Sequence, residues 1–352
     1  MTRYTTQQTA VEHSATTGFH WVRARAARLA STVMALLALG ALSACGGSGG
    51  FSAAEEGTGD NVALTGQFLD APVEGLGYST ATQSGVTDAA GRFQYLAGET
   101  VSFTLYGTPL SSSIGFSTLT PGDTGVEETD LDRIVNQLRF LQTVDADSDT
   151  SNGIRLPLIP GAFSVDFSQR IEDFDNNAAV QAFLASHAGA RPLVSVQDAV
   201  AHFGQSIDTV STGTVLSFAG RTATSAITNT ACINNVQAQQ RYAFGQSSVT
   251  LNGSDGFINT GGNCVVTPDA NEVIAYADLA AGDFLSCLPD CVYKDVNFIR
   301  HGLDVDGRTV VELSWHTPGT QKVRYIKRVL VDPGAPGQPA ALTTFKETIT
   351  FD

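Results

Sequence analysis

Basic residues are few in this sequence, which has 20 Lys and Arg against 35 Asp and Glu and a formal net charge of −15. A protein that binds nucleic acid needs a basic face, and attraction to an anionic membrane surface needs clustered Lys and Arg. The composition therefore excludes nucleic acid as a partner and membrane adsorption by charge alone. Such an acidic balance is typical of solubility, and less often of divalent cation binding.

The motifs of common enzyme classes are also absent. The sequence has no H-E-x-x-H zinc motif, no Walker loop and no dinucleotide fingerprint. It has no G-x-S-x-G turn either, because Gly245-Gln246-Ser247 lacks the closing Gly. We expect His202 to be a packed helical histidine, and His301 and His316 to lie in strands without catalytic duty. We therefore predict that the protein is not an enzyme.

The apolar run from Leu29 to Leu42 is shorter than the roughly 20 residues of a membrane-spanning helix. It follows three arginines within residues 23–28, the order typical of a secretory signal. It ends in Leu42-Ser43-Ala44-Cys45, which resembles the bacterial lipobox. The resemblance implies cleavage before Cys45 and lipid, palmitate included, on that residue. A simple cleavable signal with a chance Cys is the alternative.

The lipobox resemblance also implies a location and a partner. Gly46 rather than Asp follows Cys45, which in enterobacterial sorting favours the outer membrane. The chain would then meet the membrane through its lipid anchor and face the periplasm or the cell surface. Loss of residues 1–44 removes four arginines and one glutamate, which leaves 16 basic residues against 34 acidic ones.

Cysteines are few, and four of the five lie in the last third of the chain. Cys232, Cys264, Cys287 and Cys291 form an even set, as expected of disulfides in an oxidising compartment. Three pairings are open. The turn-like segment 288–290 favours Cys287 with Cys291, and so Cys232 with Cys264. A four-Cys zinc site is the alternative, although the spacing lacks two C-x-x-C pairs.

The chain divides into five predicted parts. They are a signal peptide (1–44), a Gly- and Ser-rich flexible tether (45–60), a β-sandwich (61–125), a helical segment with an acidic loop (126–210) and a disulfide-containing β domain (211–352).

The β-sandwich is predicted from short apolar runs between turn signals. Residues 84–95 predict a strand, a tight turn over Asp88 to Gly91, and a return strand with Phe93 and Tyr95 on one face. Together with D-x-P-V-x-G at residues 70–75, this pattern resembles the transthyretin-like or carboxypeptidase-regulatory β-sandwiches of exported bacterial proteins. The resemblance implies the fold and says nearly nothing of function.

The remaining elements follow from periodicity. Helical spacing of apolar residues predicts helices over 127–144, 178–188 and 196–207. From residue 215 onward, alternation and Gly- or Asn-rich turns predict seven or more antiparallel strands in a barrel or sandwich, and their meander order favours a barrel. The predicted fold class is therefore mainly β with a helical middle segment.

The best candidate site is the loop directly after the first helix. Asp145, Asp147 and Asp149 put three hard oxygen ligands on it, and Asn152 can complete a shell. The pattern is compatible with a calcium site, but it lacks the Gly at position 6 and the Glu at position 12 of the helix-loop-helix calcium motif, and a solvated acidic turn is the favoured interpretation. Residues 136–154 resemble a segment of exported, adhesin-like proteins of environmental proteobacteria.

These observations predict a cell-envelope lipoprotein that acts as a non-enzymatic binding or adhesion module. Its ligand would be a protein, a glycan or a small molecule, and the loops of the C-terminal domain are the expected contact surface. One alternative is a small-ligand carrier or envelope-assembly factor with a pocket inside a barrel. A second alternative is a hydrolase that the linear sequence does not reveal.

Overall fold

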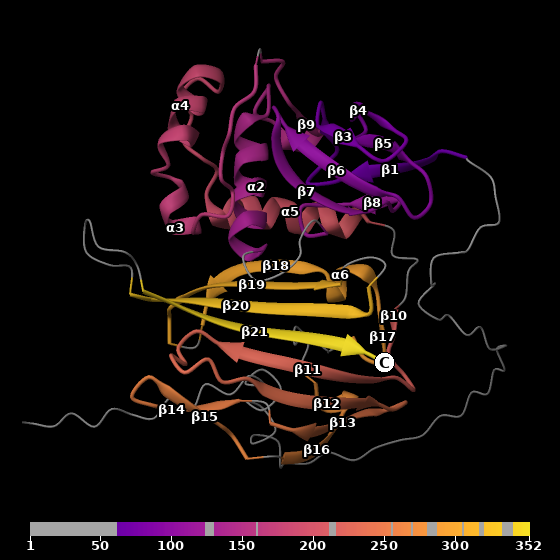
Figure 1. Cartoon of the computed structure of the whole chain (residues 1–352), viewed down its shortest axis with the longest axis vertical. Coiled ribbons are helices and arrows are strands. Elements are labelled where there is room, and N and C mark those ends of the chain that lie inside the picture. The colour runs from indigo at the N-terminus through magenta and orange to yellow at the C-terminus, as the bar shows by residue number, and fades with distance from the viewer. Residues whose placement is uncertain are drawn as a thin grey trace, which may run out of the picture.

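The fold is mainly β with a helical middle segment, as predicted (Figure 1). The computed structural model describes residues 62–123, 130–159, 161–210, 216–254, 256–268, 270–279, 287–304, 306–316, 320–332 and 341–352. The signal peptide, Cys45 and the tether lie outside the described residues, so the predictions made for them stay predictions.

The N-terminal part packs two small sheets as a β-sandwich. One sheet has the order β5-β1-β8 and the other the order β4-β3-β6-β7. Side chains alternate between the core and the solvent along β6, and Phe103 of this strand contacts Phe68 and Phe93 with ring centroids 4.6 and 5.2 Å apart. The strands are β1 (Leu64–Phe68), β3 (Gly77–Ser79), β4 (Ser84–Val86), β5 (Arg92–Tyr95), β6 (Thr100–Leu105), β7 (Thr108–Ile114) and β8 (Thr118–Leu119).

The predicted turn between β4 and β5 is present. Asp88 Oδ1 accepts the backbone N–H groups of Ala90 and Arg92, each at 2.9 Å. Gly91 has a φ of +70°, and a Cβ at this position would lie 2.6 Å from the Phe68 carbonyl oxygen. Asp88 is thus a turn residue, and Gly is needed both for its backbone angle and for space.

The helical segment contains α2 (Asp130–Val144), α3 (Ile171–Phe174), α4 (Ala178–His187) and α5 (Val196–Thr209). Asn177 caps α4 and Ser195 caps α5, each accepting a backbone N–H from the first turn. The two shorter predicted helices are therefore confirmed. The predicted start of the first helix, before Asp130, falls outside the described residues.

The C-terminal part is one antiparallel sheet of eight strands in the order β16-β13-β12-β11-β21-β20-β19-β18. Its strands are β11 (Thr222–Asn229), β12 (Ala238–Phe244), β13 (Ser248–Gly253), β16 (Ala270–Ala275), β18 (Phe298–Leu303), β19 (Thr309–His316), β20 (Lys322–Asp332) and β21 (Ala341–Phe351). The predicted simple meander is wrong at one place, because β11 pairs with β21 and so joins two four-stranded meanders. Within the described residues, β16 and β18 are the end strands and do not pair with each other.

One face of this sheet is covered by the segment that follows β16. Leu288, Cys291 and Val296 pack there with Phe244 and Phe351 in one core. The segment contains η2 (Tyr276–Asp278), β17 (Asp290–Cys291), which pairs with β10 (Leu216–Ser217), and α6 (Tyr293–Val296). Residues 293–296 therefore form a helical turn inside the region where only strands were expected. A helical turn forms there because Asp295 accepts the backbone N–H of Val292 at 2.9 Å.

The other face of β18, β19 and β20 meets the helices. Helices α2 and α5 lie between the sandwich and this sheet (Figure 1). Their buried side chains share one core with the sheet, which we call the interface core: Leu131, Ile134, Val135, Leu138, Phe203, Ile207, Leu313, Trp315 and Ile326. The N-terminal and C-terminal parts therefore form one packed body.

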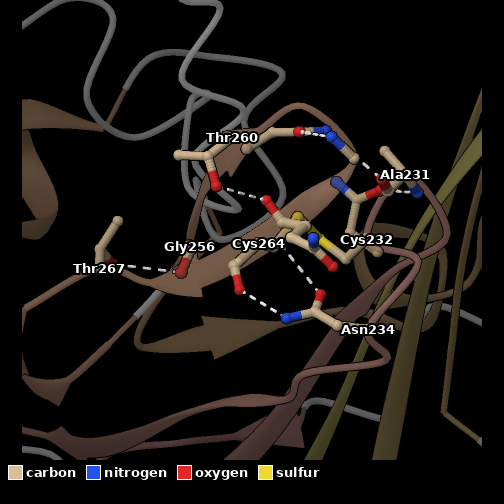
Figure 2. Close-up of a disulfide and its surroundings, with 11 residues drawn as sticks. Ala231, Cys232, Asn234, Gly256, Thr260, Cys264 and Thr267 are labelled. Carbon is tan, nitrogen blue, oxygen red and sulfur yellow. Dashed lines mark hydrogen bonds between the residues drawn. A yellow bond between two sulfur atoms is a disulfide. The ribbon is translucent and has the colours of Figure 1, made fainter.

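Both favoured disulfide pairings are present. Cys232 and Cys264 fasten the loop after β11 to the hairpin of β14 (Phe257–Thr260) and β15 (Asn263–Val266), and Cys287 joins Cys291. Figure 2 shows Asn234 facing Cys264, with which it exchanges two hydrogen bonds of 2.8 and 3.0 Å. The first disulfide thus lies in a loop that is already held by hydrogen bonds.

Candidate functional site

The acidic loop is an ordered turn between α2 and the sandwich. It continues into η1 (Thr150–Asn152) and β9 (Ile154–Arg155), and β9 pairs in parallel with β2 (Val73–Glu74). Gly153 has a φ of +112° and redirects the chain into β9. The sandwich therefore fixes one end of the loop and α2 fixes the other.

The three aspartates of the loop have different environments. Asp145 is fully buried, and its Oδ1 accepts the backbone N–H of Arg155 at 2.9 Å. Asp147 is exposed and accepts the backbone N–H of Asp149 at 3.0 Å and the amide of Asn152 at 3.3 Å. Asp149 caps η1 through the backbone N–H of Ser151. All three carboxylates thus stabilise the turn.

Asp145 also carries an unsatisfied oxygen. Among the described residues, no N–H or O–H group donates to its buried Oδ2. Burial raises the pKa of Asp145, and the neighbouring Asp147 carboxylate raises it further. The pKa of Asp147 is lowered, mainly because its carboxylate accepts the backbone N–H of Asp149. The buried carboxyl therefore holds its proton more tightly than the exposed one.

A pocket of about 310 Å³ opens where this loop packs against α5. The acidic loop supplies Ser148 and Thr150, and α5 supplies Asp198 and His202. The remaining lining residues come from the end of α2 and the segment before α5: Gln142, Thr143, Arg191, Pro192 and Val194.

Hydrogen bonds fix the walls of this pocket. Arg191 donates from Nε to the Ala188 carbonyl at 2.9 Å, from Nη2 to the Asp145 carbonyl at 3.1 Å, and from Nη1 to Ser148 Oγ. Thr143 Oγ1 accepts the Val194 N–H at 2.9 Å. The segment before α5 is thereby fastened to both α2 and the acidic loop.

A buried carboxyl group lies beneath the pocket. Asp70 follows β1, is fully buried, and accepts Gln142 Nε2 at 3.1 Å. Burial raises the pKa of Asp70 well above its ordinary value. His202 lies in the same region, and burial lowers its pKa, so its imidazole is neutral near pH 7. The charged forms of two groups are therefore disfavoured here: the His202 imidazole, which lines the pocket, and the Asp70 carboxyl, which bonds the lining residue Gln142.

Most of these residues were not predicted as site residues. His202 was expected to be a packed helical histidine, and it is half-buried, with Nδ1 3.3 Å from Thr150 Oγ1 and a buried, unpartnered Nε2. Asp70 looked like an ordinary turn residue, and Arg191 lies between two predicted helices with no motif around it. Because they approach the acidic loop only through tertiary packing, no local pattern marks them.

Two further histidines lie in strands, as expected, His301 in β18 and His316 in β19. One ring nitrogen of His316 is 3.0 Å from the Thr320 carbonyl. Asp304 accepts the backbone N–H groups of Asp306 and Arg308 in the turn before β19. These side chains therefore support strand ends and turns.

Within the described residues, no three His, Cys, Asp or Glu side chains are grouped so that they could hold a metal ion. Nor does any described helix have the length and apolarity to cross a bilayer. Comparison with known proteins gives no match, either to a family model or to a curated protein.

Proposed function

We propose that this protein is a lipid-anchored component of the bacterial outer membrane that works as a non-enzymatic binding or adhesion module. The observation that carries the binding proposal is the pocket between the acidic loop and α5. Its walls are fixed by hydrogen bonds before any ligand arrives, and a preformed site loses less conformational entropy on binding. The proposal includes a relation between the sandwich and transthyretin-like modules. The sandwich would hold the pocket away from the lipid.

Binding is favoured over catalysis by the geometry of the pocket. Its one hydroxyl next to an imidazole, Thr150 Oγ1, lies 3.3 Å from His202 Nδ1. A catalytic nucleophile needs a base that a third group orients, and within the described residues no side chain bonds the other ring nitrogen of His202. Thr143 Oγ1 is engaged on both sides, because it donates to the Arg139 carbonyl and accepts the Val194 N–H. These hydroxyl groups are better suited to structure and ligand contact than to nucleophilic attack.

The binding proposal is tested with a chain that starts at Gly46, which retains every described residue. Ligand-observed NMR would screen three panels: neutral sugars, small carboxylates and phosphates, and short apolar molecules. A pocket-based module is supported if a member of any panel binds and Asp198→Asn weakens that binding. Asp208→Asn, on the same helix, should leave it unchanged. Absence of binding in all three panels would contradict it.

The lipid anchor is tested separately, in cells. We expect the full chain to incorporate an alkyne-labelled fatty acid and to sediment with the outer membrane. Cys45→Ser should abolish both the label and the sedimentation, because the lipid is attached through that residue. A labelled Cys45→Ser chain would refute the anchor.

We propose, in addition, that the acidic loop binds calcium through Asp145, Asp147, Asp149 and Asn152. The support is the buried Asp145 Oδ2, which no donor satisfies, beside the Asp147 carboxylate. Occupation would require Asp149 to leave its capping position on η1. A cation would relieve the repulsion between these carboxylates.

Native mass spectrometry before and after a calcium chelator tests this second proposal. We expect a calcium adduct that the chelator removes and that Asp147→Ala abolishes. Asp306→Ala, in an exposed turn elsewhere, is the control and should keep the adduct. A bare mass in calcium-containing buffer would leave the loop as a solvated turn.

A further inference from the structure

The charges that line the pocket are balanced. Arg191 supplies one positive charge and Asp198 one negative charge, while the other lining residue that titrates, His202, has its pKa lowered by burial. The walls therefore carry no net charge near pH 7. A strongly anionic ligand would meet Asp198 and the carboxylates of the acidic loop, and a strongly cationic one would meet Arg191.

The pocket also offers donors and acceptors side by side. Arg191 uses three of its five N–H groups to hold its neighbours, so two remain for a ligand. Asp198 accepts the Ser195 hydroxyl at 2.7 Å through Oδ2, which leaves Oδ1 on an exposed side chain as an acceptor. The hydroxyl groups of Ser148 and Thr150 can each act as a hydrogen-bond donor or as an acceptor. An apolar ligand would leave these groups without partners.

A molecule with hydroxyl groups on neighbouring carbon atoms matches this pattern, because each hydroxyl both donates and accepts. Pro192 and Val194 form an apolar part of the wall, against which the C–H groups of such a molecule can pack. The volume of about 310 Å³ lies at the small end of ligand pockets, which run from about 300 to 1,000 Å³. The pocket is therefore sized for one small ring rather than a long chain.

We propose that this pocket binds a neutral, polyhydroxylated small molecule, namely a monosaccharide or the terminal sugar of a glycan. The inference rests on the proposed binding function and names its ligand class. The lining residues include no Trp, Tyr or Phe on which a sugar ring could stack, so we expect weak binding, with a Kd on the order of 1 mM.

Saturation-transfer NMR on the chain from Gly46 tests the proposal with glucose, galactose, mannose and N-acetylglucosamine as probes. We expect transfer to at least one of them. Thr150→Val removes a hydroxyl at nearly constant volume, and Asp198→Asn removes a charge, and each should weaken binding about fivefold. Asp208→Asn is the matched control on α5 and should bind as the native chain does. Thermal unfolding of each variant shows that the fold is kept.

The outcomes separate this inference from the binding proposal. Pocket-dependent binding of citrate, phosphate or an apolar probe, with no transfer to any sugar, would overturn the ligand class and keep the binding module. Sugar binding that neither pocket variant weakens would overturn the assignment of sugar to this site. No binding by any panel would overturn both.

Discussion

Asp123 is a residue that we expect to couple the stability of the protein to pH. Its carboxylate is fully buried beside the interface core, where it accepts Trp315 Nε1–H and the backbone N–H of Thr120, each at 2.8 Å. Burial raises its pKa from 3.8 to about 6. The folded chain therefore binds this proton more tightly than the unfolded chain does. The resulting stabilisation is fully present below pH 3.8 and is lost as pH rises through about 6.

We predict that Asp123 lowers the free energy of unfolding by about 2 kcal/mol between about pH 4 and pH 7. Asp123→Asn should remove this part of the pH dependence, and it should also lower stability in acid because an amide cannot accept the same hydrogen bonds. Urea unfolding followed by Trp315 fluorescence measures both, since Trp315 is the one Trp after residue 44. Asp208→Asn should keep the native pH dependence. The prediction would be refuted if the free energy of unfolding changed equally with pH in the native and Asp123→Asn chains.

At the scale of elements, the two disulfides differ in what they constrain. Cys232 and Cys264 are 32 positions apart, whereas Cys287 and Cys291 are 4 apart. Closing a longer loop removes more entropy from the unfolded chain. The first disulfide should therefore stabilise the fold more, although both lie in the same half of the molecule.

We predict that replacing Cys232 and Cys264 together by Ala costs about 4 kcal/mol, and that replacing Cys287 and Cys291 costs about 2 kcal/mol. Chemical denaturation of the two double variants and the native chain gives both values. Cys232, Cys264 and Cys291 are almost fully buried whereas Cys287 is partly buried, so loss of packing adds more to the cost of the first double variant. A larger loss for the short loop would show that local packing, rather than loop closure, dominates.

At the scale of the whole molecule, a buried arginine joins the two halves. Arg328 on β20 has a side chain only 5% exposed and pairs with Asp132 of α2 and with Glu172 of α3, the latter at 3.1 Å. Removing it would take the guanidinium away from two partly buried carboxylates, which would keep, among the described residues, only the Ile171 N–H at Asp132 and the more distant Arg170 at Glu172. Breaking such a pair from one side is strongly destabilising.

We predict that Arg328→Ala lowers the free energy of unfolding by about 3–5 kcal/mol. The neighbouring Lys327, on the opposite face of β20, is one third exposed and pairs with Glu312, so Lys327→Ala should cost less than about 1 kcal/mol. Calorimetry of both variants makes the comparison. Similar losses would mean that the halves do not depend on this ion pair.

Local elements were the predictable part of the fold. Helices α4 and α5 follow from apolar spacing and from side chains that cap their own first turns, so their signals lie within a few residues. The segment at 293–296 is helical within a region expected to contain only strands, because the hydrogen bond that Asp295 accepts from the Val292 N–H outweighs the β propensity of its neighbours. Strand and turn signals placed β4, β5 and the Asp88 turn between them for the same local reason, although the two strands pair in different sheets.

The sequence by itself determined the mainly β class, the helical middle segment and the position of the acidic loop, because each depends on residues close together in the chain. It also favoured both disulfide pairings, because four cysteines allow only a small number of alternatives. Only the tertiary structure decided that β11 pairs with β21, where Ala223 lies opposite Phe351. It also decided that Arg191 and His202 meet the acidic loop in one pocket. Such contacts depend on how whole elements pack, and hydrophobic burial, which drives that packing, acts between surfaces without regard to their separation in sequence.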